Sequence, residues 1–315
     1  MKARTLALSI RENWNDPFWF RDKIMRKVVL PILFGENNGV YVLNEKWDNL
    51  ILLDACRYDT FAETYGAHGL RGRLEFRISR GTETKSFLRE NFGGRKDFKD
   101  LVYITANPTV TQLFNQKFYK VISVWKDEWD SRYQTVLPER MYERVLNAIA
   151  EYPNKRLIIH FLQPHRPFVG YPYPDWWRFK KPGVRYFHIW GDFNEKGRSW
   201  LAQVDRETLI ELYSKNLGLV LPYVRRLQEA LPGVTVVSSD HGEAFGDWLY
   251  PLAPLHVYGH PGKTRINALT KVPWLVAESE HKKSITAGPA MSPSESLTDE
   301  DEELIEKRLS ALGYI

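Results

Sequence analysis

The sequence predicts an α/β protein with a doubly wound, mostly parallel β-sheet flanked by helices. Two observations support this fold class: short apolar runs recur along the chain, and segments with helical spacing lie between them. The runs that we predict as central parallel strands are 49–54, 101–107, 156–162, 234–240 and 272–278. The segments 139–152 and 209–231 carry the helical spacing. This alternation is typical of a doubly wound sheet.

Length and composition point to one main domain. The chain has 315 residues, of which 43% are hydrophobic and 26% are charged, and it shows no repeat of 20–50 residues. We expect an N-terminal helical or anchor-like extension over 1–46 and a main domain over 47–280. A polar linker and a short helix with an acidic first turn are expected over 281–315.

The charge balance and the single cysteine limit the partners and the compartment. Net charge is +5, but the 44 basic residues are spread among 39 acidic ones, so we predict no nucleic-acid binding. An anionic substrate or an anionic membrane surface fits this charge. Cys56 is the only cysteine, which excludes an internal disulfide and is compatible with a reducing compartment. The number of subunits cannot be predicted from these features.

The N-terminal segment has no secretory signal pattern, and its apolar run 28–35 is far shorter than the roughly 20 residues that span a bilayer. Basic residues precede this run, so residues 23–35 could lie on an anionic membrane surface. The alternative is a helix packed on the domain. We therefore expect a cytoplasmic protein, either free or peripheral at the membrane.

Acidic and imidazole side chains follow three of the predicted strands. Asp54 ends the first, His165 follows 156–162, and Asp240 ends 234–240, which continues into His241 and Glu243. Ligands of open α/β sheets bind at the carboxyl ends of the strands, so these groups are expected to converge. Carboxylate and imidazole ligands without thiolates favour Mn, Zn or Mg over Ca, with one or two ions bound. The simpler alternatives are a helix N-cap for Asp54 and a surface position for His165.

Several stretches together resemble the alkaline phosphatase superfamily in its sulfatase-like branch. LILLDACRYDTFAETYG (50–66) is similar to the opening signature of that branch, and SSDHGE (238–243) to its second metal-binding signature. HFLQPHRPF (160–168), KVPWLV (271–276) and the tail RLSALGYI (308–315) also resemble segments of that branch.

The resemblance implies a three-layer α/β/α fold with a catalytic domain over 47–280. It also implies metal ligands at Asp54, Asp240 and His241, and contact between His165 and a sulfuryl or phosphoryl group.

The nucleophile is expected to be a threonine. Sulfatases of this branch modify a cysteine in a Cys-x-Pro-x-Arg context, which Cys56 lacks, whereas phosphatase and phosphotransferase members use Thr or Ser. Thr84 stands where the predicted helix KSFLRENF begins, so its hydroxyl could both bind a cation and attack an ester. Thr82 is the competing candidate. A plain N-cap is the structural alternative for Thr84.

Three further residues are candidates for handling the transferred group and the leaving group. His260, between Gly259 and Pro261, could donate a proton or bind a cation, and Lys263 and Arg57 could neutralise the oxyanion. Arg57 could instead pair with Asp59 on the first helix.

The sequence therefore predicts a metal-dependent hydrolase of phosphate or sulfate esters that acts through a threonine. An anionic, glycan- or lipid-linked ester is the expected substrate, because the aromatic segment 168–200 could stack on sugar rings. One alternative is a transferase that moves phosphoglycerol or phosphoethanolamine onto a surface glycan or lipid. The other is a glycan-binding relative without turnover.

Overall fold

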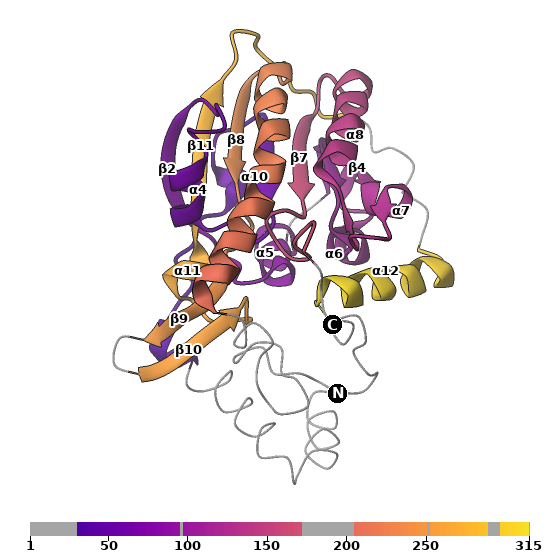
Figure 1. Cartoon of the computed structure of the whole chain (residues 1–315). Helices are drawn as coiled ribbons and strands as arrows, with labels where there is room; N and C mark the ends of the chain where they lie inside the picture. Colours follow the sequence, from indigo (N-terminus) through magenta and orange to yellow (C-terminus); the bar gives the residue numbers. More distant parts are fainter. Residues whose placement is uncertain (1–29, 95–96, 172–204, 251–252, 289–296, 315) are drawn as a thin grey trace.

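A seven-stranded sheet organises the computed structural model, which describes residues 30–94, 97–171, 205–250, 253–288 and 297–314. The strand order within this part of the chain is β2-β11-β8-β1-β7-β3-β4. Figure 1 labels β2, β11, β8, β7 and β4 of this sheet. In that order the strands are Arg73–Ile78, Lys271–Glu278, Val234–Ser238, Asn49–Leu53, Arg156–Phe161, Phe98–Thr105 and Phe118–Ser123. The predicted runs thus all form strands of one sheet.

Strand direction agrees with the prediction for four of the five predicted runs. β8, β1, β7 and β3 are parallel neighbours, and β4 continues the parallel set. The run 272–278 was predicted to be parallel, which is wrong: β11 is antiparallel to both β8 and β2. The chain leaves β8 at its carboxyl end and forms a hairpin of β9 (Ala244–Tyr250) and β10 (Ala253–Gly259). After the short helix α11 (Asn267–Thr270) it enters β11 beside that same end. No helical crossover intervenes, and parallel neighbours require one.

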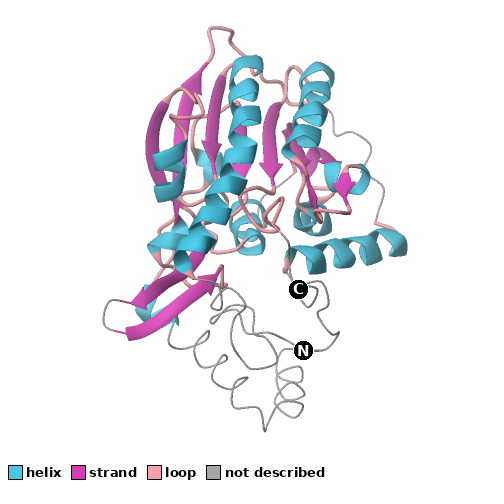
Figure 2. Ribbon diagram, in the orientation of Figure 1, coloured by secondary structure: helices cyan, strands magenta, loops and turns pink. Residues whose placement is uncertain are grey.

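Helices cover both faces of the sheet, which gives three layers (Figure 2). On one face, Ile51 and Leu53 of β1 share a hydrophobic cluster with α4 (Tyr58–Thr64), α8 (Pro138–Glu151) and α10 (Arg206–Ala230). On the other face, the alternate residues Leu50 and Leu52 share a cluster with α5 (Thr84–Phe92) and α6 (Pro108–Phe114). Both faces of β1 are buried, as expected of a central strand in a doubly wound sheet.

The remaining elements are short or lie at the sheet edges. They are α3 (Leu30–Phe34), η2 (Val42–Asn44), α7 (Val124–Asp127), β5 (Trp129–Asp130), β6 (Thr135–Val136), β9 (Ala244–Tyr250), β10 (Ala253–Gly259), α11 (Asn267–Thr270) and α12 (Asp299–Leu312). The C-terminal helix predicted within 281–315 runs over Asp299–Leu312, and its first turn is acidic as expected. Thr298 and Asp301 form a capping box at its first turn.

α12 packs on the same core as the sheet. Its buried residues Ile305, Leu309 and Leu312 belong to the cluster that contains β1, α8 and α10. Lys126, in the last turn of α7, pairs with Asp301 of α12. Figure 1 shows α12 at the edge of the sheet to which β7 points. The last helix is therefore anchored next to the carboxyl ends of the central strands.

Two sequence predictions fall wholly or partly outside the described residues. The proposed membrane-facing segment 23–35 is described from residue 30 onwards, where Leu30 packs with β9, β10 and α11. The aromatic segment 168–200 is described only up to residue 171. No helix within the described ranges has the length and apolar character to cross a bilayer. The predicted cytoplasmic location gains no support from these features.

Candidate active site

The candidate site lies at the carboxyl ends of the neighbouring strands β8, β1 and β7. Asp54 follows β1, and its backbone N–H still bonds to Phe161 at the end of β7. Ala55 then has a positive φ of 60°, which turns the chain away from the sheet, and its N–H donates to Asp240 Oδ1 over 3.2 Å. Helix α4 begins later, with Arg57 as its N-cap. Asp54 is therefore not a helix cap, and its carboxylate faces the neighbouring strand ends.

Two carboxylates and an imidazole form a compact, fully buried group. Ligand atoms of Asp54, Asp240 and His241 all lie within 4.8 Å of one another. His241 Nε2 is 3.6 Å from Asp54 Oδ1 and 3.4 Å from Asp240 Oδ2. His241 Nδ1 faces its own main chain, 2.9 Å from the carbonyl oxygen of Gly242. Nε2 is thus the nitrogen presented to the two carboxylates.

Thr84 contacts this group, and Thr82 does not. The Thr84 hydroxyl donates to Asp240 Oδ2 over 2.7 Å and lies 3.3 Å from His241 Nε2. Glu83 is the N-cap of α5 and shares a capping box with Ser86, so Thr84, the first helical residue, leaves its side chain free for the site. The Thr82 hydroxyl instead accepts the backbone N–H of Lys263 over 2.9 Å.

Asp54 is held by two donors on one oxygen only. Its Oδ2 accepts hydrogen bonds from Asn107 Nδ2 and from the Tyr314 hydroxyl, each over 2.7 Å. Its Oδ1 is buried and has no hydrogen-bond partner among the described residues. Asn107 is also the N-cap of α6, directly after β3. A third neighbour, His160 of β7, places Nε2 3.7 Å from Asp240 Oδ2.

Burial and mutual repulsion perturb the ionisation of these groups. Burial, together with the neighbouring Asp240, raises the pKa of Asp54 well above its usual range. Burial also disfavours the Asp240 carboxylate, but His241, His160 and the Thr84 hydrogen bond outweigh it and lower the pKa of Asp240. Burial lowers the pKa of His241, and that of His160 to about 4, so both rings are neutral at pH 7 and suited to metal binding.

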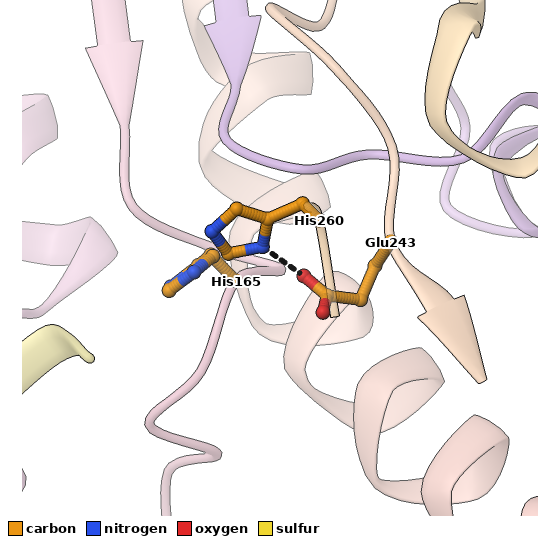
Figure 3. A group of neighbouring side chains, drawn as sticks. All are labelled: His165, Glu243 and His260. Atoms are coloured by element: carbon orange, nitrogen blue, oxygen red, sulfur yellow. Dashed lines mark hydrogen bonds and ion pairs between the residues drawn. The ribbon is translucent and has the colours of Figure 1, made fainter. Parts of the chain in front are cut away.

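His165, Glu243 and His260 form a second group of potential metal ligands (Figure 3). His165 follows β7, Glu243 precedes β9 and His260 follows β10, and their ligand atoms lie within 4.8 Å of one another. His260 Nδ1 is 2.9 Å from Glu243 Oε2. Glu243 Oε1 and His165 Nε2 are buried without a hydrogen-bond partner in the described part of the chain. The ring centroids of His241 and His260 are 4.8 Å apart, so the two groups adjoin.

Arg57 and Lys263 belong to neither group of potential metal ligands: Arg57 forms ion pairs and Lys263 is exposed. The Arg57 guanidinium pairs with Asp59 at 2.6 Å and with Asp247 at 2.9 Å, and it also donates to the carbonyl oxygen of Glu243 over 3.0 Å. The alternative in which Arg57 pairs with Asp59 therefore has direct geometric support. Lys263 is exposed, with a positive φ of 69°.

Four residues at the site were not chosen as site residues from the sequence. His160 lies in the predicted strand 156–162 and in the HFLQPHRPF stretch, so it was identifiable there. Glu243 belongs to the SSDHGE stretch and was identifiable there. Asn107 ends a predicted strand, where its amide gave only the weak signal of a helix cap. Tyr314 meets Asp54 across 260 residues of sequence, and no local pattern reports such a contact.

With this geometry in place, the chain can be compared with known proteins. The sulfatase family model matches residues 91–305, which is more than half of the chain. The chain belongs to the sulfatase family. The match agrees with the sulfatase-like signatures found in the sequence.

Similar solved structures include two from Neisseria meningitidis. The soluble domain of lipooligosaccharide phosphoethanolamine transferase A is 14% identical with a TM-score of 0.45, covering 73% of this chain and 75% of that one. The integral membrane form of this transferase is 13% identical to this chain, with a TM-score of 0.47. The match covers 87% of this chain and 58% of that chain.

The periplasmic domain of a phosphoethanolamine transferase from Campylobacter jejuni is 18% identical to this chain, with a TM-score of 0.44. The match covers 74% of this chain and 78% of that chain. No curated protein matches the sequence.

Proposed function

We propose that this sulfatase-family chain is a metal-dependent hydrolase of phosphate or sulfate esters that uses Thr84 as its nucleophile. The observation that carries the proposal is the position of the Thr84 hydroxyl, which lies within hydrogen-bonding distance of Asp240 and beside His241. A threonine hydroxyl is a weak nucleophile unless its surroundings favour loss of the proton. The buried acidic and imidazole groups around Thr84 are of the kind that hold an activating cation.

The first group has the donor set of a divalent cation site. Asp54 Oδ1, Asp240 Oδ2 and His241 Nε2 would bind one ion together with Thr84 Oγ1. Two adjacent buried carboxylates repel each other, and the unpartnered Oδ1 of Asp54 is costly without a counter-charge. Oxygen and imidazole donors fit Mn, Zn or Mg better than Ca. When bound, such a cation lowers the pKa of a coordinated hydroxyl and offsets anionic charge on the ester.

Thr84 would make the new bond in the first half of the reaction. Its hydroxyl proton points to Asp240 Oδ2, the nearest acceptor. The Thr84 oxygen attacks the phosphorus or sulfur atom as its proton passes to Asp240 Oδ2, and the bond to the ester alcohol breaks. The alcohol leaves with the bonding electrons and takes up a proton from His260 or from water. Water then attacks the threonyl ester: its hydroxyl group joins the phosphorus or sulfur atom, a proton returns to the Thr84 oxygen, and phosphate or sulfate is released.

We assign the second group to the same reaction. Buried His165 and Glu243 each present an unpartnered atom, and His260 is close to both. This arrangement supports a second divalent cation that would sit beside the transferred group. If only one ion binds, His260 is instead placed to donate the proton that the leaving alcohol requires. Lys263 and Arg57 are then left as secondary candidates for contact with the oxyanion.

The substrate class and the final acceptor are tested together by one panel. Purified protein is assayed with p-nitrophenyl phosphate, bis-p-nitrophenyl phosphate and p-nitrophenyl sulfate, with added Mn²⁺, Zn²⁺, Mg²⁺ or Ca²⁺ and with or without glycerol. We expect turnover that needs a cation other than Ca²⁺. Release of free phosphate or sulfate supports a hydrolase, whereas a glycerol adduct as the main product supports the transferase alternative. Binding of glycans without turnover of any ester supports the non-catalytic alternative.

A further inference from the structure

One hydroxyl at the candidate site comes from the far end of the described chain. The Tyr314 phenol donates to Asp54 Oδ2 over 2.7 Å, accepts from Asn107 Nδ2 over 3.1 Å, and lies 3.2 Å from Thr84 Oγ1. The proposed reaction does not use this hydroxyl. It contacts Asp54, which is a proposed metal ligand, and Asn107, which also bonds to Asp54. It also lies beside Thr84, the proposed nucleophile.

A helix C-cap directs Tyr314 into the site. Gly313 ends α12 in the left-handed conformation, with a φ of 81°. The Tyr314 N–H then bonds back to the carbonyl oxygen of Leu309 over 2.9 Å. Glycine adopts this conformation at little cost, whereas a residue with a Cβ is strained there. A Cβ at position 313 would also lie 3.0 Å from Arg166 Nη2. The turn thus fixes where the phenol points.

The tyrosine ring is held as well as the hydroxyl. It stacks on His165 with ring centroids 5.0 Å apart and an angle of 20° between the planes. The His260 ring lies 5.7 Å away, centroid to centroid. Tyr314 therefore contacts both groups, with its hydroxyl bonded to Asp54 and its ring face against His165.

The hydrogen bonds on Asp54 have an orienting effect. Tyr314 and Asn107 both occupy Oδ2, which leaves Oδ1 directed toward His241 Nε2, 3.6 Å away. Partners behind a metal ligand hold it in the geometry that the ion requires, and their loss usually weakens metal binding about 10- to 100-fold. The phenol is neutral, so it holds the carboxylate without competing for the cation.

We propose that Tyr314 is a positioning residue that orients Asp54 for cation binding. This inference rests on the proposed function, because it presumes that Asp54 binds a cation. It makes the C-terminal turn of α12 part of the metal site. The Tyr314 hydroxyl is expected to set the affinity of the cation, while Thr84 carries the bond-forming step.

Calorimetric titration of the cation-free protein with Mn²⁺ and Zn²⁺ tests the inference without an activity assay. Tyr314→Phe removes one oxygen atom and keeps the ring against His165. We expect its affinity for the cation to fall about 10-fold or more. Tyr152→Phe is the matched control, since it removes a hydroxyl that donates to Glu151 at the end of α8. The affinity of the control variant should equal that of the wild type.

A second variant moves the phenol without removing it. Gly313→Ala strains the turn that places Tyr314 and should also weaken cation binding, while far-ultraviolet circular dichroism stays unchanged. Unchanged or tighter binding in Tyr314→Phe, with wild-type binding present, overturns the inference and leaves the proposed function standing. A wild-type protein that binds neither Mn²⁺ nor Zn²⁺ overturns the proposed function itself.

Discussion

Thr84 Oγ1 donates a hydrogen bond to Asp240 Oδ2 over 2.7 Å, although 156 residues separate them in the sequence. The parallel sheet delivers Asp240 to its carboxyl edge after β8, and α5 begins at that same edge. Glu83 takes the N-cap position, so the Thr84 side chain is not needed to cap its own helix. This pair joins the proposed nucleophile to the proposed metal ligand, and the predictions below depend on it.

Replacing Thr84 separates the two threonine candidates. Thr84→Ala should lower turnover of the preferred ester on the order of 1,000-fold or more, because the covalent route is lost. Thr84→Ser keeps a hydroxyl and should retain part of the activity. Thr82→Ala is the control, since the Thr82 hydroxyl accepts only the Lys263 N–H among the contacts described. Steady-state rates measured with equal cation loading distinguish the two threonines. Loss of activity in Thr82→Ala but not in Thr84→Ala would make Thr82 the nucleophile.

Asp240 should be required for cation binding. Asp240→Asn removes a charge from the proposed ligand set, and we expect bound metal to be lost, with affinity reduced more than about 100-fold. Asp100→Asn is a control at a half-buried aspartate that pairs with Arg156 outside the site. Elemental analysis after dialysis gives the metal content of each variant. Equal metal in Asp240→Asn and wild type would place the cation elsewhere.

The second group should hold an ion of its own. The wild type is expected to bind two divalent cations per chain, and Glu243→Gln to bind one, because Glu243 supplies the only carboxylate among the three described side chains of that group. Glu45→Gln, at a partly exposed ion pair with Arg77, serves as the control. Titration calorimetry gives the number of sites. One site in the wild type would leave His260 as the proton donor.

Cation binding should release a proton over an acidic range of pH. Asp54 has its pKa raised above the ordinary 3.8 by burial and by Asp240, so the cation-free folded protein keeps a proton that an exposed aspartate has lost. Between the ordinary pKa of an aspartate and the raised pKa of Asp54, the free energy of unfolding of the cation-free protein falls as pH rises. The affinity for the cation rises over the same range, until the pH exceeds the raised pKa. Calorimetry in buffers of different ionisation enthalpy measures the released proton. Asp54→Asn should abolish the release.

The central strands could be predicted from the sequence because buried strands appear as short runs of consecutive apolar residues. The run 49–54 contains four consecutive apolar residues, 50–53, as is typical of a strand buried on both faces. The direction of β11 was missed, because an apolar run reports burial and not orientation. The edge strands β2 and β4 were missed for a related reason: their half-exposed residues alternate with polar ones and give a weaker signal.

The site was predictable where its residues end strands. Asp54, Asp240 and His241 follow apolar runs, so the rule for open α/β sheets applied to them. The contacts that complete the site join residues far apart in sequence, such as Tyr314 with Asp54 and Asn107 with Asp54. Such contacts depend on how α12 and α6 pack at the edge of the sheet. The sequence pattern of either helix alone does not predict that packing.

Arg57 should act mainly on stability. Its guanidinium is buried and binds Asp59, Asp247 and a main-chain carbonyl group, so Arg57→Ala should lower the free energy of unfolding by about 2 kcal/mol. Arg57→Lys keeps the charge but cannot form the same paired hydrogen bonds, so it should be only partly tolerated. Urea unfolding measures both effects. A variant with unchanged stability and strongly reduced turnover would favour the alternative in which Arg57 neutralises the oxyanion.

The central claim is that Asp54, Thr84, Asp240 and His241 share one divalent cation. Anomalous diffraction from crystals grown with Mn²⁺ tests it most directly. We predict an anomalous peak within bonding distance of Asp54 Oδ1, Asp240 Oδ2, His241 Nε2 and Thr84 Oγ1. Well-ordered crystals at saturating Mn²⁺ with no peak among these four atoms, and with Thr84 still bonded to Asp240, would contradict it.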